Sequence, residues 1–141
     1  MSIADVVNLY WEQCWNQRRT DRLSEVFHDP YLHGITEVPI SRMAAIVDEA
    51  VGWMPDFKTE AIDSEILENV IINRMIFTGT HKGKLFGISG TGKPIRCPSL
   101  DIFFFRDGKV WRYWHQTDHL PLITGMEAEV RVGDELADWD A

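Results

Sequence analysis

The sequence of 141 residues is short of basic residues, cysteines and long apolar runs, and each shortage excludes a class of protein. Its 14 lysines and arginines are outnumbered by 22 acidic residues, which gives a net charge of −8. Because this charge repels phosphate backbones and anionic lipid surfaces, we expect neither nucleic acid nor membranes as partners. No uncharged stretch is long enough to cross a bilayer, and the first residues lack the pattern of a signal peptide. We therefore expect a cytoplasmic protein.

Two further motifs are incomplete. The cysteines Cys14 and Cys97 lie far apart without the spacing of a metal site or a redox pair, so we expect two small buried apolar side chains. The stretch 87–93, GISGTGK, fits the start of a phosphate-binding loop, but Pro94 stands where such a loop needs a hydroxyl group for magnesium. The aromatic and branched residues that follow favour a strand. The sequence therefore predicts a glycine-rich connection between two strands, without a nucleotide site.

The first third of the chain has helical patterning. Apolar residues recur at spacings of three and four over residues 3–16 and again over 41–54. A short helix is predicted between them, at 21–27. Asp21 and Ser41 are the expected N-caps of the second and third helices.

The patterning changes after Pro55, from helical to strand-like. Four long strands are predicted, separated by turn residues, at 57–69, 70–83, 95–106 and 109–117. Helices followed by strands predict an α+β fold with a mostly antiparallel sheet, and helices that cover one face of a curled sheet leave a pocket. We expect one domain over 1–126 and an acidic C-terminal tail over 127–141.

The last two predicted strands are joined by Arg106-Asp107-Gly108-Lys109, a strong signal for a two-residue hairpin turn. If Arg106 and Lys109 pair and the ladder continues without a bulge, Asp101 lies opposite Trp114 and shares a face with Asp118. A bulge would reverse this parity. The regular register places two carboxyl groups on one face, with room for a small organic molecule between them.

Each acidic residue has two interpretations. Asp101 interrupts an apolar run, so its carboxyl group is either paired with a neighbouring tyrosine, tryptophan or backbone N–H, or kept protonated for catalysis. Asp118 is either a second catalytic group or the cap of a following helix. His81 is either a polar pocket residue or an exposed residue at a strand end. We expect no metal site, because His115 and Asp118 project to opposite faces of a strand.

The segment 79–126 resembles the C-terminal half of SnoaL-like polyketide cyclases, in the superfamily that also contains nuclear transport factors and ketosteroid isomerases. The resemblance rests on the pattern G-x-H-x-G-x-x-x-G, a T-G-K turn, a D-G-K-V hairpin and a late aspartate. Weaker agreement at 15–21 and 29–32 extends it to about residues 5–126. It implies a cone-shaped α+β barrel, described as a cystatin-like roll, that forms a homodimer and holds a small apolar ligand.

The resemblance also implies an intramolecular aldol closure of a polyketide ester, without a cofactor, run by acid and base side chains. Asp118 falls where the cyclases carry their essential aspartate. Asp101 departs from the histidine of the cyclases and resembles the aspartate that ketosteroid isomerases keep protonated in an oxyanion hole. His33 matches a polar residue of the cyclase pocket, and His81 falls in the glycine pattern.

The resulting hypothesis is that Asp118 takes a proton from carbon next to a ketone or ester while protonated Asp101 donates a hydrogen bond to the enolate. His81 is a third candidate catalytic residue, and His33 a candidate ligand contact. The expected pocket walls are Tyr10, Trp53, Phe103 and Trp114. The alternatives are a ligand-binding or dimerising module without turnover, and an isomerase, dehydratase or epoxide hydrolase.

Overall fold

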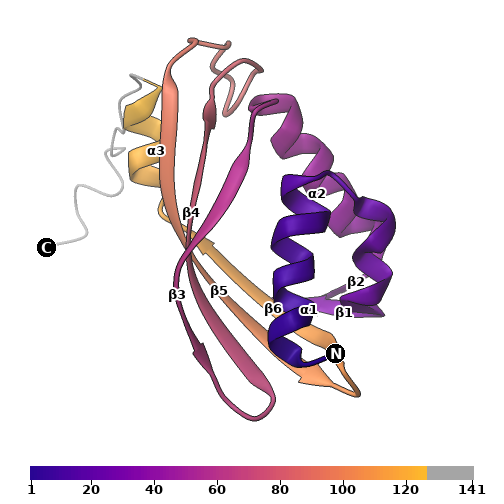
Figure 1. Cartoon of the computed structure of the whole chain (residues 1–141). Coiled ribbons are helices and arrows are strands. Elements are labelled where there is room, and N and C mark those ends of the chain that lie inside the picture. The colour runs from indigo at the N-terminus through magenta and orange to yellow at the C-terminus, as the bar shows by residue number, and fades with distance from the viewer. Residues whose placement is uncertain (127–141) are drawn as a thin grey trace, which may run out of the picture.

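The computed structural model describes residues 1–126, which form a curled sheet covered by helices (Figure 1). The sheet has six strands in the order β2-β1-β6-β5-β4-β3, and all neighbours are antiparallel except β1 and β6. Its edges are β2 and β3, so the sheet curls without closing into a complete barrel. The α+β prediction is confirmed. The strands are β1 (Phe27–His33), β2 (Thr36–Val38), β3 (Lys58–Ile66), β4 (Val70–Thr80), β5 (Pro94–Arg106) and β6 (Lys109–Thr117).

The N-terminal helix forms as predicted, in two parts. The helix α1 (Ile3–Leu9) starts at a capping box in which Ser2 and Asp5 exchange hydrogen bonds. It continues into η1 (Tyr10–Asn16), which has the wider turn of a π-helix and buries its aromatic residues. Figure 1 shows α1 and α2 (Ile40–Trp53) together on one side of the curved sheet. Two further helices lie within residues 1–126: the short 3₁₀-helix η2 (Thr20–Glu25) and α3 (His119–Gly125), which packs against the start of β5.

Both predicted N-caps are wrong. The helix η2 begins one residue earlier than expected. Asp21 does not cap this helix and instead forms an ion pair with Arg19 at 2.9 Å. The helix α2 begins at Ile40, after Pro39, so Ser41 already lies inside its first turn. Pro39 is the N-cap and has no side-chain acceptor, and Asp29 Oδ1 accepts instead from the backbone N–H of Ile40 at 3.1 Å. The strand β1 was predicted only in part, as a short extended piece over 31–35.

One aromatic cluster joins the helices to the concave face of the sheet. The ring of Tyr10 packs edge-on against Phe27, Phe103 and Tyr113, with ring centres 5.3, 5.6 and 5.8 Å away. All four side chains are buried. Burying one such ring contributes roughly 1.5–3 kcal/mol to folding, so this cluster fixes how η1 lies over β5 and β6. Cys14 and Cys97 are also buried, as expected.

The hairpin between β5 and β6 contains a bulge that corrects the predicted register. Arg106 pairs with Lys109 and Phe105 with Val110, but Phe104 pairs with Arg112. Trp111 is therefore an extra residue in β6, and every pair beyond it moves by one position. Asp101 lies opposite His115 rather than Trp114.

The glycine-rich stretch is a connection between β4 and β5, as predicted, and Pro94 begins β5. Gly90 is required there, because a Cβ atom at this position would lie 2.0 Å from the carbonyl oxygen of Lys82. The predicted tail, 127–141, lies outside the described residues. No described helix is long and apolar enough to span a membrane.

Candidate functional site

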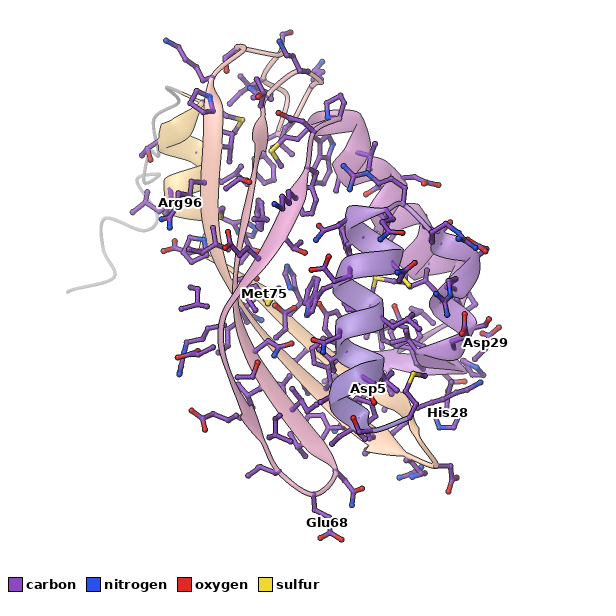
Figure 2. All side chains as sticks on the ribbon, viewed as in Figure 1. Asp5, His28, Asp29, Glu68, Met75 and Arg96 are labelled. Atoms are coloured by element: carbon purple, nitrogen blue, oxygen red, sulfur yellow. The ribbon has the colours of Figure 1, made fainter. Side chains whose placement is uncertain are left out.

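A cavity of about 270 Å³ lies between the concave face of the sheet and the helices. Most of its wall is apolar and is formed by residues that include Tyr10, Trp11, Trp15, Met43, Trp53 and Phe57. Figure 2 labels Met75, which lines the cavity midway along the sheet, and Glu68, which lies far from it at the turn between β3 and β4. Among the described residues, no lysine, arginine, aspartate or glutamate lines the cavity. It therefore suits a neutral, apolar ligand.

Several polar groups at the cavity come from two neighbouring rows on the sheet. One row consists of Asn73, Asp101 and His115, and the next consists of Met75, Ser99 and Thr117, each taken from β4, β5 and β6 in turn. Alternate residues of a strand point to the same face, so both rows face the helices. This register places a carboxylate, an imidazole and two hydroxyl groups next to one another.

Asp101 lies behind the surface of the cavity. Its side chain is 0% exposed, and both of its oxygen atoms are hydrogen-bonded. The hydroxyl group of Ser99 donates to Oδ2 at 3.0 Å, and the phenol of Tyr113 donates to Oδ1. His115 Nδ1 lies 2.5 Å from the same Oδ1. Ser99, Tyr113 and His115 line the cavity, and Asp101 supports all three from below.

His115 is the polar group best placed for proton transfer. Because the carboxylate of Asp101 accepts a hydrogen bond from His115 Nδ1–H, the neutral ring carries its proton on Nδ1 and its lone pair on Nε2. Nε2 lies 2.6 Å from Thr117 Oγ1, another residue of the cavity wall. The His115 side chain is 36% exposed, so a ligand can reach it. An imidazole oriented by a buried carboxylate is a common arrangement for a general base.

The two buried tyrosines of the site keep their protons. Burial raises the pKa of Tyr113 well above its ordinary value of 10, and the charge of Asp101 adds to this effect. Burial likewise raises the pKa of Tyr10, whose hydroxyl group donates to Met43 Sδ at 3.4 Å. Both phenols therefore act as hydrogen-bond donors near neutral pH rather than as bases.

His33, predicted as a ligand contact, lines the cavity from the end of β1. Its Nδ1 lies 3.1 Å from the hydroxyl oxygen of Tyr31. Burial lowers the pKa of His33 below its ordinary value of 6.5, and the charges of His115 and Arg42 lower it further. The ring is therefore neutral near pH 7.

The structure places the other predicted catalytic residues away from the cavity. Asp118 is exposed and caps α3, where its Oδ1 accepts from the backbone N–H of Leu120 at 3.2 Å. The two carboxyl groups therefore do not open into one cavity, and the catalytic role of Asp118 stays a prediction. His81 is fully buried rather than exposed, and its Nδ1 lies 3.1 Å from Thr91 Oγ1.

Two of the four expected wall residues, Tyr10 and Trp53, line the cavity, and the other two do not. Phe103 is buried in the core beneath Tyr10, and Trp114 lies on the opposite face of the sheet, where its ring is near Gly34. The bulge at Trp111 explains the second difference, because it turns Trp114 outward and His115 inward.

Sequence reasoning missed His115, Ser99 and Thr117 as site residues. The alternation of Tyr113, His115 and Thr117 along β6 was an available signal for a polar face. A hairpin without a bulge, as predicted, places these three residues of β6 on the face of the sheet opposite Asp101. Among residues 1–126, no group of three or more histidines, cysteines or acidic residues is arranged to hold a metal ion.

Comparison with solved structures shows the same fold in several bacterial proteins. TsrD from Streptomyces laurentii is 22% identical, with 90% of this chain and 96% of TsrD covered and a TM-score of 0.82. AclR from Streptomyces galilaeus, described as a candidate hydroxylase, is 21% identical over 99% of this chain and 91% of its own, with a TM-score of 0.78. IdmH from Streptomyces antibioticus, described as a candidate polyketide cyclase, is 18% identical over 91% of this chain and 100% of its own, with a TM-score of 0.80.

Sequence comparison then identifies the family. A search of curated proteins gave no match. The family model of the SnoaL-like polyketide cyclases, in contrast, matches residues 5–125, nearly the whole described part of the chain. The resemblance inferred from the glycine pattern and the D-G-K-V hairpin is thereby confirmed. The chain belongs to the SnoaL-like polyketide cyclase family.

Proposed function

We propose that this protein is a cofactor-independent enzyme that removes a proton from carbon next to the carbonyl group of a small apolar ketone or ester. The observation that carries the proposal is the pairing of Asp101 with His115 at 2.5 Å at the wall of an apolar cavity. Family membership supports the same chemistry, because its members are named as polyketide cyclases. The cavity has no charged residue in its described wall, which favours a neutral substrate.

In this proposal His115 is the general base and Asp101 is a positioning residue. Nε2 of His115 accepts the proton, and the electron pair of the broken C–H bond forms the enolate. Asp101 holds the ring through Nδ1–H and stabilises the imidazolium that results. Thr117 must turn its hydroxyl group away from Nε2 when the substrate binds. General base catalysis of this kind typically contributes about 10²–10⁴-fold to the rate.

The enolate then has two fates, which are the family's ring closure and the alternative isomerisation. In an aldol closure, the enolate carbon forms a bond to a second carbonyl carbon, and the resulting alkoxide takes the proton held on His115. In an isomerisation, the same proton returns to another carbon. Both fates begin with the same step, so loss of a carbon-bound proton is the sharpest test of the proposal.

The test is exchange of the acidic carbon-bound protons of β-tetralone in deuterium oxide, followed by NMR. The wild-type protein should accelerate exchange, and His115→Ala should lower the rate by about 10²-fold or more. Asp118→Asn is the matched control, because its side chain caps α3 outside the cavity wall. Exchange that survives in His115→Ala would refute the base. Binding of β-tetralone without exchange would favour a ligand-binding module.

We also propose that the chain forms a homodimer through the outer face of the sheet. Ile72, Ile102 and Trp114 pair across β4, β5 and β6 on the face opposite the cavity, and each is only half-buried. An apolar row of this kind on a sheet gains stability when a second copy covers it.

A further inference from the structure

The enolate step needs a hydrogen-bond donor for the developing oxyanion, and most polar groups of the cavity wall are already committed. Tyr113 and Ser99 donate to Asp101. Trp11 donates to Asn73 at 3.0 Å, and the hydroxyl group of Thr59 donates to Asn16 at 3.1 Å. The indole nitrogen of Trp15 has no partner among the described residues, but this atom is covered by protein. Asp101, the predicted donor, does not reach the cavity wall.

His33 faces the base across the site from the end of β1. His119 also lines the cavity, at the first residue of α3, where its ring packs edge-on against Phe86. His33 pairs with Tyr113 across the parallel strands β1 and β6, and the two ring centres are 5.7 Å apart. Tyr113 in turn stacks on His115, with ring centres 6.1 Å apart. The imidazoles of His33 and His115 therefore flank the same tyrosine ring on one face of the sheet. A carbonyl compound lying over Tyr113 would have the base on one side and His33 on the other.

Tyr31 contacts Nδ1 of His33, which leaves Nε2 as the nitrogen that can meet a ligand. The phenol of Tyr31 is buried, and burial raises its pKa well above the ordinary value of 10, so it keeps its proton. When this hydroxyl group donates to Nδ1 at 3.1 Å, the proton of the neutral imidazole is on Nε2. Nε2 then remains as a donor for a ligand in the cavity. A ring held in this way is preorganised before substrate arrives.

Burial, together with the charges around His33, keeps its ring neutral during the reaction. Arg42 already disfavours a protonated ring. When His115 takes the proton from carbon, its new positive charge disfavours protonation of His33 still more. A neutral imidazole can therefore donate a hydrogen bond from Nε2 throughout the step, without itself passing a proton to the substrate.

We propose that His33, held by Tyr31 with its proton on Nε2, is the hydrogen-bond donor that stabilises the oxyanion of the substrate. This assignment rests on the proposed function and adds a catalytic residue to it. It gives the site two histidines with separate roles, in which His115 accepts a proton from carbon and His33 binds the carbonyl oxygen. It also moves the oxyanion donor from β5, where sequence reasoning placed it, to β1.

The test compares three variants in the β-tetralone exchange assay. His33→Gln keeps an N–H donor close to the position of Nε2, whereas His33→Leu keeps only the bulk. We expect His33→Leu to lower the exchange rate by about 10²–10³-fold, the usual effect of losing one oxyanion donor, and His33→Gln to recover at least about tenfold of that loss. Tyr31→Phe, which releases the tautomer, should lie between wild type and His33→Leu. Equal rates for wild type and His33→Leu would overturn the assignment.

A binding measurement decides the same point without turnover. Para-nitrophenol is a planar oxyanion mimic whose absorbance reports its ionisation. Wild type should bind the phenolate in preference to the phenol, and this preference should fall in His33→Leu but persist in His33→Gln and in His115→Ala. If exchange depends on His115 while the phenolate preference is unchanged in His33→Leu, the proposed function stands and the donor assignment fails. If wild type neither exchanges β-tetralone nor prefers the phenolate, both fail.

Discussion

Asp101 and His115 face each other across β5 and β6 because Trp111 adds one residue to β6. Without the bulge, His115 would point to the outer face, and the buried carboxylate would lie opposite an indole ring. One inserted residue thus determines whether the concave face carries a proton acceptor. Bulges often occur next to active sites, where they redirect a side chain.

Replacing Asp101 with asparagine should separate orientation from proton acceptance. The amide keeps the shape but removes the negative charge, and its NH₂ group opposes the donors that now converge on the carboxylate. We expect β-tetralone exchange to fall by about 10²-fold and the free energy of unfolding to fall by about 1–3 kcal/mol, because buried polar groups lose partners. Urea unfolding measures the second effect. An unchanged exchange rate in a folded variant would show that His115 needs no buried partner.

Asp118 offers the opposite test, because the sequence left it as either a catalytic base or the cap of a following helix, and the structure shows the cap. Asp118→Ala removes the acceptor for the N–H of Leu120, which should cost about 0.5–2 kcal/mol of stability. Asp118→Asn retains a capping oxygen and should cost less. We expect both variants to retain β-tetralone exchange within a fewfold of wild type. A loss of exchange in Asp118→Asn, at unchanged stability, would restore the two-carboxylate hypothesis.

The sequence predicted the elements of the fold better than it predicted the site. The helix over 3–16 and the long strands have clear periodicity, and tertiary packing reinforced these local preferences. The bulge at Trp111 left no such mark, because an Asp-Gly turn is compatible with either ladder. Side chains alternate with a period of two along a strand. The prediction omitted the extra residue and therefore placed Trp114 and His115 on the wrong faces of the sheet.

Asp101 shows which features of the site local sequence can predict and which it cannot. Asp101 was recognised as a buried acid that needs partners, and a tyrosine partner was one of the two interpretations. Its connection to His115 depended on a pairing between strands that composition cannot show. His33 reaches the site because β1 runs parallel to β6, a contact between residues far apart in the chain.

Stability should depend on pH through His33. Its native pKa is lowered, chiefly by burial, whereas the unfolded chain titrates near 6.5. Below pH 6.5 the unfolded state therefore binds more protons at this residue, so its neutral form stabilises the fold at higher pH and this contribution is lost on acidification. Lowering the pH from 7.5 to 5 should therefore reduce the free energy of unfolding of the wild type more than that of His33→Gln. Parallel curves over this range would contradict the shift.

The connection between β4 and β5 should be sensitive to a single methyl group. In Gly90→Ala the new Cβ atom would collide with the backbone of Lys82, so the loop must move. We expect a destabilisation of about 1–3 kcal/mol, as for other overpacked sites. Gly52→Ala is the matched control, since no atom lies within 4 Å of its Cβ position in α2, and alanine should stabilise that helix slightly. Thermal unfolding of the two variants should shift in opposite directions, and equal shifts would argue against the close approach.

Charge on the outer face of the sheet should separate the proposed homodimer. Ile102 occupies the middle of the row formed with Ile72 and Trp114, so Ile102→Glu would place two carboxylates at the centre of an apolar contact. Because a buried unpaired charge is costly, sedimentation should show a dimer for wild type and a monomer for the variant. Ile35→Glu is the control, since Ile35 is 81% exposed between β1 and β2. The cavity is on the other face, so the Ile102→Glu monomer should still exchange β-tetralone. If sedimentation shows that the wild type is a monomer, the proposed homodimer is refuted.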